Sequence, residues 1–167
     1  SFPENEFPFS HKTILSEDSM GDLYRPNPET DGLLPLVVKR LARAETRMAA
    51  KGHRIRFAVS RGPLNICTFL MGTTEFLMAM KTEPEKTKTL IATVTDFVVS
   101  WLAYQKERFP SIGGIFVLDD ILGFIGREDF LEFALDPFTR VFSSFGAEVR
   151  FLHNDAPCAV SAPFLAS

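Results

Sequence analysis

Polar side chains follow three short apolar segments of the sequence, each at the point where a strand is predicted to end. Ser60-Arg61 follows the first segment, Asp119-Asp120 the second and His153-Asn154-Asp155 the third. In parallel α/β folds the carboxyl ends of the strands form the active-site face, so these side chains are predicted to meet there. Polar residues also occur wherever a strand becomes a loop, and that is the alternative interpretation of each group.

The adjacent carboxylates Asp119 and Asp120 are candidate catalytic residues. Successive side chains of an extended chain point in opposite directions, so only one of the two is expected to face the mouth of the site. That carboxylate could act as a general acid or base, bind a cationic nitrogen or ligate a metal. The other is expected to cap the loop or to pair with a base.

His153 and Asp155 lie two residues apart, on the same side of an extended segment. Imidazole and carboxylate are both zinc ligands, so the pair is a candidate metal site, and His153 is also a candidate catalytic residue. Asn154 and Arg61 are candidate substrate-binding residues. A His-x-Asp pattern is a weak signal that Cys158 nearby strengthens only slightly, and the alternative is a histidine held by neighbouring hydrogen bonds.

The elements that must position these residues alternate between strand and helix. Strands are predicted at 54–60, 115–118 and 148–152, and helices at 32–52, 63–71, 75–80, 84–108, 127–135, 137–145 and from 159 onward. Such alternation is typical of parallel strands joined by right-handed helical crossovers, in an open doubly wound sheet or a barrel. A closed (β/α)₈ barrel needs about 250 residues, so this α/β chain is predicted to be part of one.

Local signals refine these boundaries. Asp31 is the expected N-cap of the first helix, and Thr82-Glu83-Pro84-Glu85 is predicted to form a capping box for the long one. Residues 1–32 lack sustained periodicity and are predicted to be an extended lead-in loop whose apolar side chains pack on parts outside this chain. Residues 33–167 would form the partial barrel domain.

Composition narrows the range of partners and locations. A net charge of −3 gives no electrostatic reason to expect nucleic acid or a membrane surface as partner, and no apolar run is long enough to span a bilayer. Cys67 and Cys158 make no disulfide framework, which favours a reducing compartment, so a cytoplasmic location is expected. The 17 phenylalanines predict a core of large apolar side chains or a pocket walled by Phe.

Several segments together resemble the uroporphyrinogen decarboxylase superfamily. Residues 62–72 (GPLNICTFLMG), followed by a short helix and the long helix from Pro84, resemble the family's Gly-Pro-x-Thr/Asn turn and its helix. Residues 28–35 resemble the segment before this block, 114–120 the next strand, and 130–138 the F-x-x-F-x-x-P helix start after it. The resemblance extends over most of the chain from about residue 26 and rests on the order and spacing of these motifs.

The resemblance implies a (β/α)₈ barrel of which this chain is the middle part. The family contains porphyrinogen decarboxylases, which need no cofactor, and methyltransferases that act with corrinoid proteins, several of them zinc-dependent. The decarboxylases carry Tyr at the position of Phe69, a further candidate substrate-binding residue, and Ser at the position of Asp120. The zinc methyltransferases carry His-x-Cys where this chain has His153-Asn154-Asp155.

These departures from the decarboxylase pattern favour a corrinoid-linked methyltransferase-type enzyme with a corrinoid protein as partner, in which His153 and Asp155 would bind a metal such as zinc or the methyl donor. The alternative is a uroporphyrinogen-type decarboxylase, a lyase that acts on a tetrapyrrole without a cofactor. A third hypothesis is a non-catalytic part of a barrel that forms a homodimer, because a half-barrel exposes apolar strand edges and helix faces.

Overall fold

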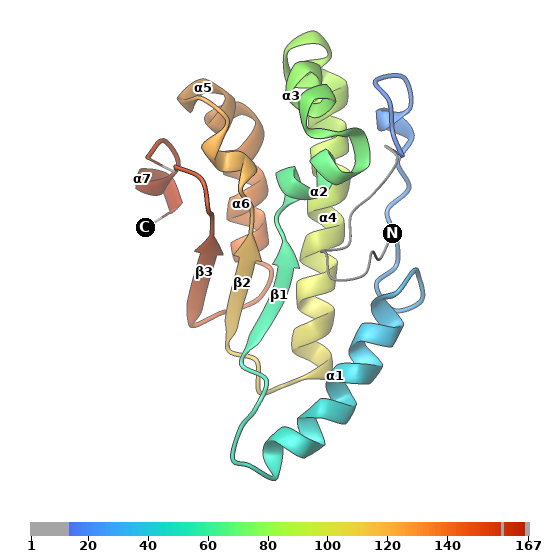
Figure 1. Cartoon of the computed structure of the whole chain (residues 1–167), viewed down its shortest axis with the longest axis vertical. Coiled ribbons are helices and arrows are strands. Elements are labelled where there is room, and N and C mark those ends of the chain that lie inside the picture. Colours follow the sequence, from blue (N-terminus) through green and yellow to red (C-terminus); the bar gives the residue numbers. More distant parts are fainter. Residues whose placement is uncertain (1–13, 158, 166–167) are drawn as a thin grey trace, which may run out of the picture.

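A sheet of three parallel strands forms the centre of the computed structural model, which describes residues 14–157 and 159–165. The strands are β1 (Phe57–Arg61), β2 (Gly114–Leu118) and β3 (Val149–His153), and they lie in the order β1-β2-β3. All three arrows point the same way in Figure 1. The predicted parallel sheet is confirmed, with strand ends that differ from the prediction by at most three residues.

Helices connect the strands in the predicted order. They are α1 (Leu34–Ala49), α2 (Pro63–Met71), α3 (Thr73–Thr82), α4 (Pro84–Arg108), α5 (Arg127–Asp129), α6 (Leu135–Phe142) and α7 (Ala162–Leu165), with the short turns η1 (Met20–Asp22), η2 (Ile121–Gly123) and η3 (Phe130–Ala134). Strands that alternate with helical crossovers in this way make an α/β fold consistent with part of a (β/α) barrel. Within the described residues, no helix is both long and apolar enough to cross a bilayer.

The expected break before the helix at Asp136-Pro137 is wrong. α5, η3 and α6 follow one another without an intervening loop, and η3 is one turn of π-helix. Pro137 has no backbone N–H and cannot complete the hydrogen-bond ladder of a regular α-helix. The wider π turn just before it accommodates that gap, so the chain stays helical through both residues.

The core lies between the sheet and its covering helices. Ala58 of β1 and Ile115 and Val117 of β2 are fully buried, and α4 packs against both β1 and α6. Four phenylalanines are among the largest fully buried side chains: Phe76, Phe109, Phe130 and Phe138. The core therefore accounts for part of the abundance of Phe.

Two predicted helix caps are wrong because other groups compete for the same side chains. The carboxylate of Asp31 accepts the N–H of Asn27 and the hydroxyl of Thr30, both at 2.8 Å, and the first of these bonds lowers the pKa of Asp31. The N-cap of α1 is Leu33, without a side-chain bond. The capping box before α4 is also absent, because the Thr82 hydroxyl donates to the Glu17 carboxylate at 3.0 Å instead.

The described part of the lead-in segment packs on this chain, contrary to the expectation that its apolar residues cover parts outside it. Met20 in η1 is fully buried, and the Thr87 hydroxyl of α4 lies 4.0 Å from its sulfur. Tyr24, in contrast, is 75% exposed. Met20, together with the partly buried Leu15 and Leu23, thus attaches this segment to the core of the chain.

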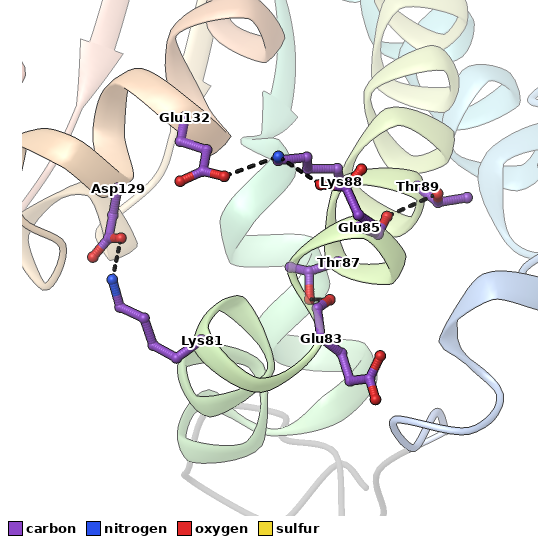
Figure 2. A network of polar contacts seen from close by, with 8 residues as sticks. All are labelled: Lys81, Glu83, Glu85, Thr87, Lys88, Thr89, Asp129 and Glu132. Atoms are coloured by element: carbon purple, nitrogen blue, oxygen red, sulfur yellow. Dashed lines mark hydrogen bonds and ion pairs between the residues drawn. The ribbon is translucent and has the colours of Figure 1, made fainter.

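Ion pairs tie the crossover helices together near the carboxyl ends of the strands. Figure 2 shows Lys81 of α3 reaching Asp129 of α5, and Lys88 of α4 reaching both Glu132 of η3 and Glu85 of its own helix. Both Lys88 pairs have an N–O distance of 2.9 Å. Exposed pairs of this kind contribute little to stability individually. They do hold the two crossovers side by side at the end of the sheet where the polar strand ends lie.

Candidate functional site

No helix among the described residues covers one face of the sheet, and the side chains of that face stand in register. We call it the open face; its three rows are Phe57/Gly114/Val149, then Val59/Phe116/Phe151, then Arg61/Leu118/His153. Val59 is 43% exposed and Phe151 49%, whereas the alternating residues Ala58 and Val117 are fully buried against helices. The last row lies at the carboxyl ends of the strands, so Arg61 and His153 share one face as predicted.

Aromatic rings run along the open face toward His153. The ring of Phe116 stacks on Phe151 with centroids 5.0 Å apart and lies 6.2 Å from the His153 ring at an interplanar angle of 18°. Sequence reasoning did not single out Phe116 or Phe151. The alternation Val149-Phe151-His153 was the signal, because residues two apart on a strand share a face.

Arg61 and Phe69, both predicted to bind substrate, come together at the end of β1. The guanidinium carbon of Arg61 lies 5.8 Å from the centroid of the Phe69 ring, within range of a cation–π contact. Phe69 is 52% exposed. Within the described part of the chain no carboxylate forms an ion pair with Arg61, so its charge is available to a ligand.

His153 at the end of β3 and the two loop residues after it, Asn154 and Asp155, make different contacts. His153 Nε2 lies 3.2 Å from an Asp155 carboxylate oxygen, and both side chains are solvent-accessible. Asp120 accepts the backbone N–H of Asp155 at 2.9 Å, so it fixes this loop beside the end of β2. The side-chain oxygen Oδ1 of Asn154 accepts the N–H of Ala156 at 2.7 Å, so it is occupied within its own loop.

Asp119 is fully buried and caps α2 from the end of β2. One carboxylate oxygen accepts the backbone N–H groups of Leu64 and Asn65, each at 3.1 Å, and the other accepts that of Ile121 at 3.1 Å. The donors at 64 and 65 belong to the first turn of α2, where a helix leaves its N–H groups without partners. Burial raises the pKa of Asp119 to about 7, even though these hydrogen bonds favour the charged form.

The turn before α2 is shaped to receive this carboxylate. A Cβ atom on Gly62 would lie 2.6 Å from Cβ of Asp119, so only glycine permits the approach. Cys67 in α2 is fully buried, and burial together with the nearby Asp119 charge raises the pKa of its thiol. As expected for adjacent acids, the two side chains point in different directions. Asp119 accepts hydrogen bonds from the first turn of α2, and Asp120 accepts one from the loop after β3.

A metal at this site would need more ligands than the described residues supply. His153 and Asp155 offer two, whereas zinc sites use three or four protein ligands. In the described ranges, no three His, Cys, Asp or Glu side chains gather closely enough to hold a metal ion. Cys158 lies outside the described residues. The described residues alone therefore do not fit a complete zinc site.

Comparisons with known proteins agree on family and fold. A family model described as uroporphyrinogen decarboxylase (URO-D) matches residues 1–159. Among solved structures, a methyltransferase from Methanosarcina mazei superposes with a TM-score of 0.78 at 14% sequence identity, over 93% of this chain and 45% of that chain. At such low identity the likeness is one of fold, and this chain spans less than half the length of that methyltransferase. No curated protein matches this sequence. The match of the family model over nearly the whole chain places this protein in the uroporphyrinogen decarboxylase family.

Proposed function

We propose that this chain forms part of the active site of a methyltransferase-type enzyme that acts with a corrinoid protein. The observation that carries the proposal is the His153–Asp155 pair at the end of β3, above the aromatic rings of the open face. A carboxylate beside one ring nitrogen favours the tautomer in which that nitrogen bears the proton. The other nitrogen, Nδ1, is then free to accept a proton from a substrate.

Each residue of the site has a role in such a reaction. Methyl transfer to a thiol or hydroxyl requires that the nucleophile lose its proton, and His153 Nδ1 would take that proton while Asp155 stabilises the resulting charge. Asp120 would keep the loop in place through the Asp155 N–H. Arg61 over Phe69 would bind an anionic group of the substrate, two strand spacings or roughly 10 Å from His153 across the last row.

Transfer of a methyl group from free methylcobalamin to a small thiol tests the proposal directly. The loss of a general base lowers rates by about 10²- to 10⁴-fold, so His153→Ala should abolish most of the transfer. His53→Ala is the matched control, because His53 is an exposed histidine that precedes β1, away from the polar strand ends. Absence of transfer by the wild type, or equal rates for wild type and His153→Ala, would refute the proposal.

Decarboxylation of a porphyrinogen is the second candidate, favoured by the Arg61 guanidinium that has no carboxylate partner among the described residues. The Arg61 guanidinium would hold a carboxylate of the substrate. Asp119 is unsuited to face pyrrole nitrogens because both its oxygens are buried on backbone N–H groups, which leaves Asp120 for that role. A porphyrin that binds should shift its visible absorption spectrum on titration, and Arg61→Ala should remove the shift. An unchanged spectrum with the wild type would eliminate this candidate.

A homodimer is the third candidate, favoured by the exposed apolar rows of the open face. Val149 is 50% exposed and Phe151 49%, which is unusual for neighbouring large apolar side chains of a soluble domain. Size-exclusion chromatography with light scattering would detect the dimer, and a monomer at every concentration would eliminate this candidate.

A further inference from the structure

Two side chains contact the His153 imidazole, one at its edge and one at its face. Asp155 lies at the edge, with a carboxylate oxygen 3.2 Å from Nε2. Phe116 of β2 lies against the face, with ring centroids 6.2 Å apart and planes 18° apart, within the range of offset stacking. A contact at one edge atom leaves the ring able to tilt about that atom, whereas a stacked neighbour restrains the plane of the ring.

The edge contact is the weaker restraint of the two. The Asp155 side chain is 79% exposed and that of His153 41%, so water competes for both partners. An exposed ion pair holds its side chains loosely, because solvent weakens the attraction and conformational entropy opposes a fixed geometry. The bond from the Asp155 N–H to Asp120 fixes the backbone of the loop and leaves the Asp155 carboxylate free to rotate.

Phe116, in contrast, is held on both sides along the sheet. β2 pairs with β1 and with β3, and Phe116 stands in register between Val59 and Phe151. The Phe151 ring stacks on it with centroids 5.0 Å apart and planes 5° apart. The strand neighbours Ile115 and Val117 are fully buried on the other face. These partners all belong to the three described strands, so the restraint on Phe116 is the same whichever strands complete the barrel.

We propose that Phe116 is a positioning residue for His153 and sets the plane of the imidazole so that Nδ1 faces the substrate. A phenyl ring has no exchangeable proton, so Phe116 acts only through the histidine. Proton transfer requires hydrogen-bond geometry, and a small misplacement of the base lowers the rate strongly. The role of His153 as base rests on the function proposed above, whereas the restraint of its ring rests on the packing of β2 against β3.

Nuclear magnetic resonance of the histidine rings tests the restraint without any measurement of activity. The chain has three histidines, and loss of one set of ring signals in His153→Ala identifies those of His153. In the wild type, the ring current of the stacked phenyl should shift the His153 ring protons upfield of those of the exposed His53. Phe116→Leu keeps an apolar side chain and removes the flat face, so the His153 signals should move to the position of an exposed histidine.

Two further variants separate positioning from general loosening of the sheet. Phe57→Leu makes the same change in the first row of the open face, at the amino ends of the strands, and should leave the His153 signals unchanged. Phe116→Tyr keeps a flat ring at the position and should retain the upfield shift. Circular dichroism checks that each variant is folded.

Methyl transfer from methylcobalamin to a small thiol measures the consequence for the reaction. Phe116→Leu should lower kcat by about three- to tenfold, as expected for the loss of one aromatic contact, and should leave KM for the thiol unchanged. This loss is smaller than the one expected for His153→Ala, since the base itself remains. Phe116→Tyr should restore kcat.

Three results would overturn the proposal. The first, wild-type His153 signals at the position of an exposed histidine, is decisive even where Phe116→Leu fails to fold. The second is an unchanged His153 spectrum in folded Phe116→Leu. The third is an equal kcat for the wild type and that variant. Absence of transfer by the wild type would instead refute the proposed function, and the spectra would still decide whether Phe116 positions the ring.

Discussion

Replacement of Asp119 by alanine tests the assignment of this carboxylate as the cap of α2. The variant leaves three buried backbone N–H groups, at Leu64, Asn65 and Ile121, without their acceptor. A buried donor that loses its partner costs about 1 to 3 kcal/mol, with the lower figure apt where water can enter the vacated space. We therefore expect Asp119→Ala to lower the free energy of unfolding by about 3 to 4 kcal/mol at about pH 5, a large share of an ordinary domain's stability.

The loss should depend on pH because the carboxyl group itself titrates. Its pKa is raised from 3.8 to about 7 in the folded chain. Between these values the folded state holds a proton that the unfolded state has released, so this group's contribution to stability falls as pH rises and levels off above about 7. Each pKa unit corresponds to about 1.4 kcal/mol, so the gap between wild type and Asp119→Ala should narrow by about 3 kcal/mol from about pH 5 to about pH 8.

Urea unfolding followed by circular dichroism and by the fluorescence of Trp101, the only tryptophan, measures both effects. Asp120→Ala is the matched control, because this neighbouring carboxylate accepts a single N–H in a partly exposed loop. Its cost should stay below about 1 kcal/mol at the lower pH. A cost for Asp119→Ala that is equal at the two pH values, or no larger than that of Asp120→Ala at the lower one, would refute the assignment.

Three further predictions concern the turn before α2, the ion pairs and the open face. Gly62→Ala places a Cβ 2.6 Å from that of Asp119 and should destabilise the chain by about 2 to 3 kcal/mol in urea unfolding, whereas Gly126→Ala, with no atom within 4 Å, should have little effect. Lys88→Ala breaks the two links from Lys88 to Glu85 and Glu132 in Figure 2 and should lower the urea midpoint slightly at low salt and not at high salt; an equal loss in both would contradict a screened surface interaction. Phe151→Asp should weaken self-association measured by light scattering without unfolding the chain, since Phe151 is 49% exposed, and unchanged association would exclude the open face as the contact surface.

The alternation of elements could be predicted because it depends on local patterns. Gly62-Pro63 and Gly72 predicted the bounds of α2, and the apolar spacing between Pro84 and Pro110 predicted α4. The continuous apolar run at 115–118 predicted the central strand. The caps at Asp31 and Thr82 could not be predicted in the same way. A short polar side chain chooses among several nearby partners, and the choice depends on how the chain folds back around it.

The sequence by itself determined that three strand ends carry polar residues and that those ends share one edge of a parallel sheet. Only the tertiary structure decided which of the two adjacent aspartates caps α2 and which one binds the loop after β3. The reason is that Asp119 accepts hydrogen bonds from residues that are 54 and 55 positions away in the sequence. The same holds for Gln105, which meets Val59 across 46 residues. Contacts at such separations leave no periodic signal in the sequence, since they arise only when helix and strand pack together.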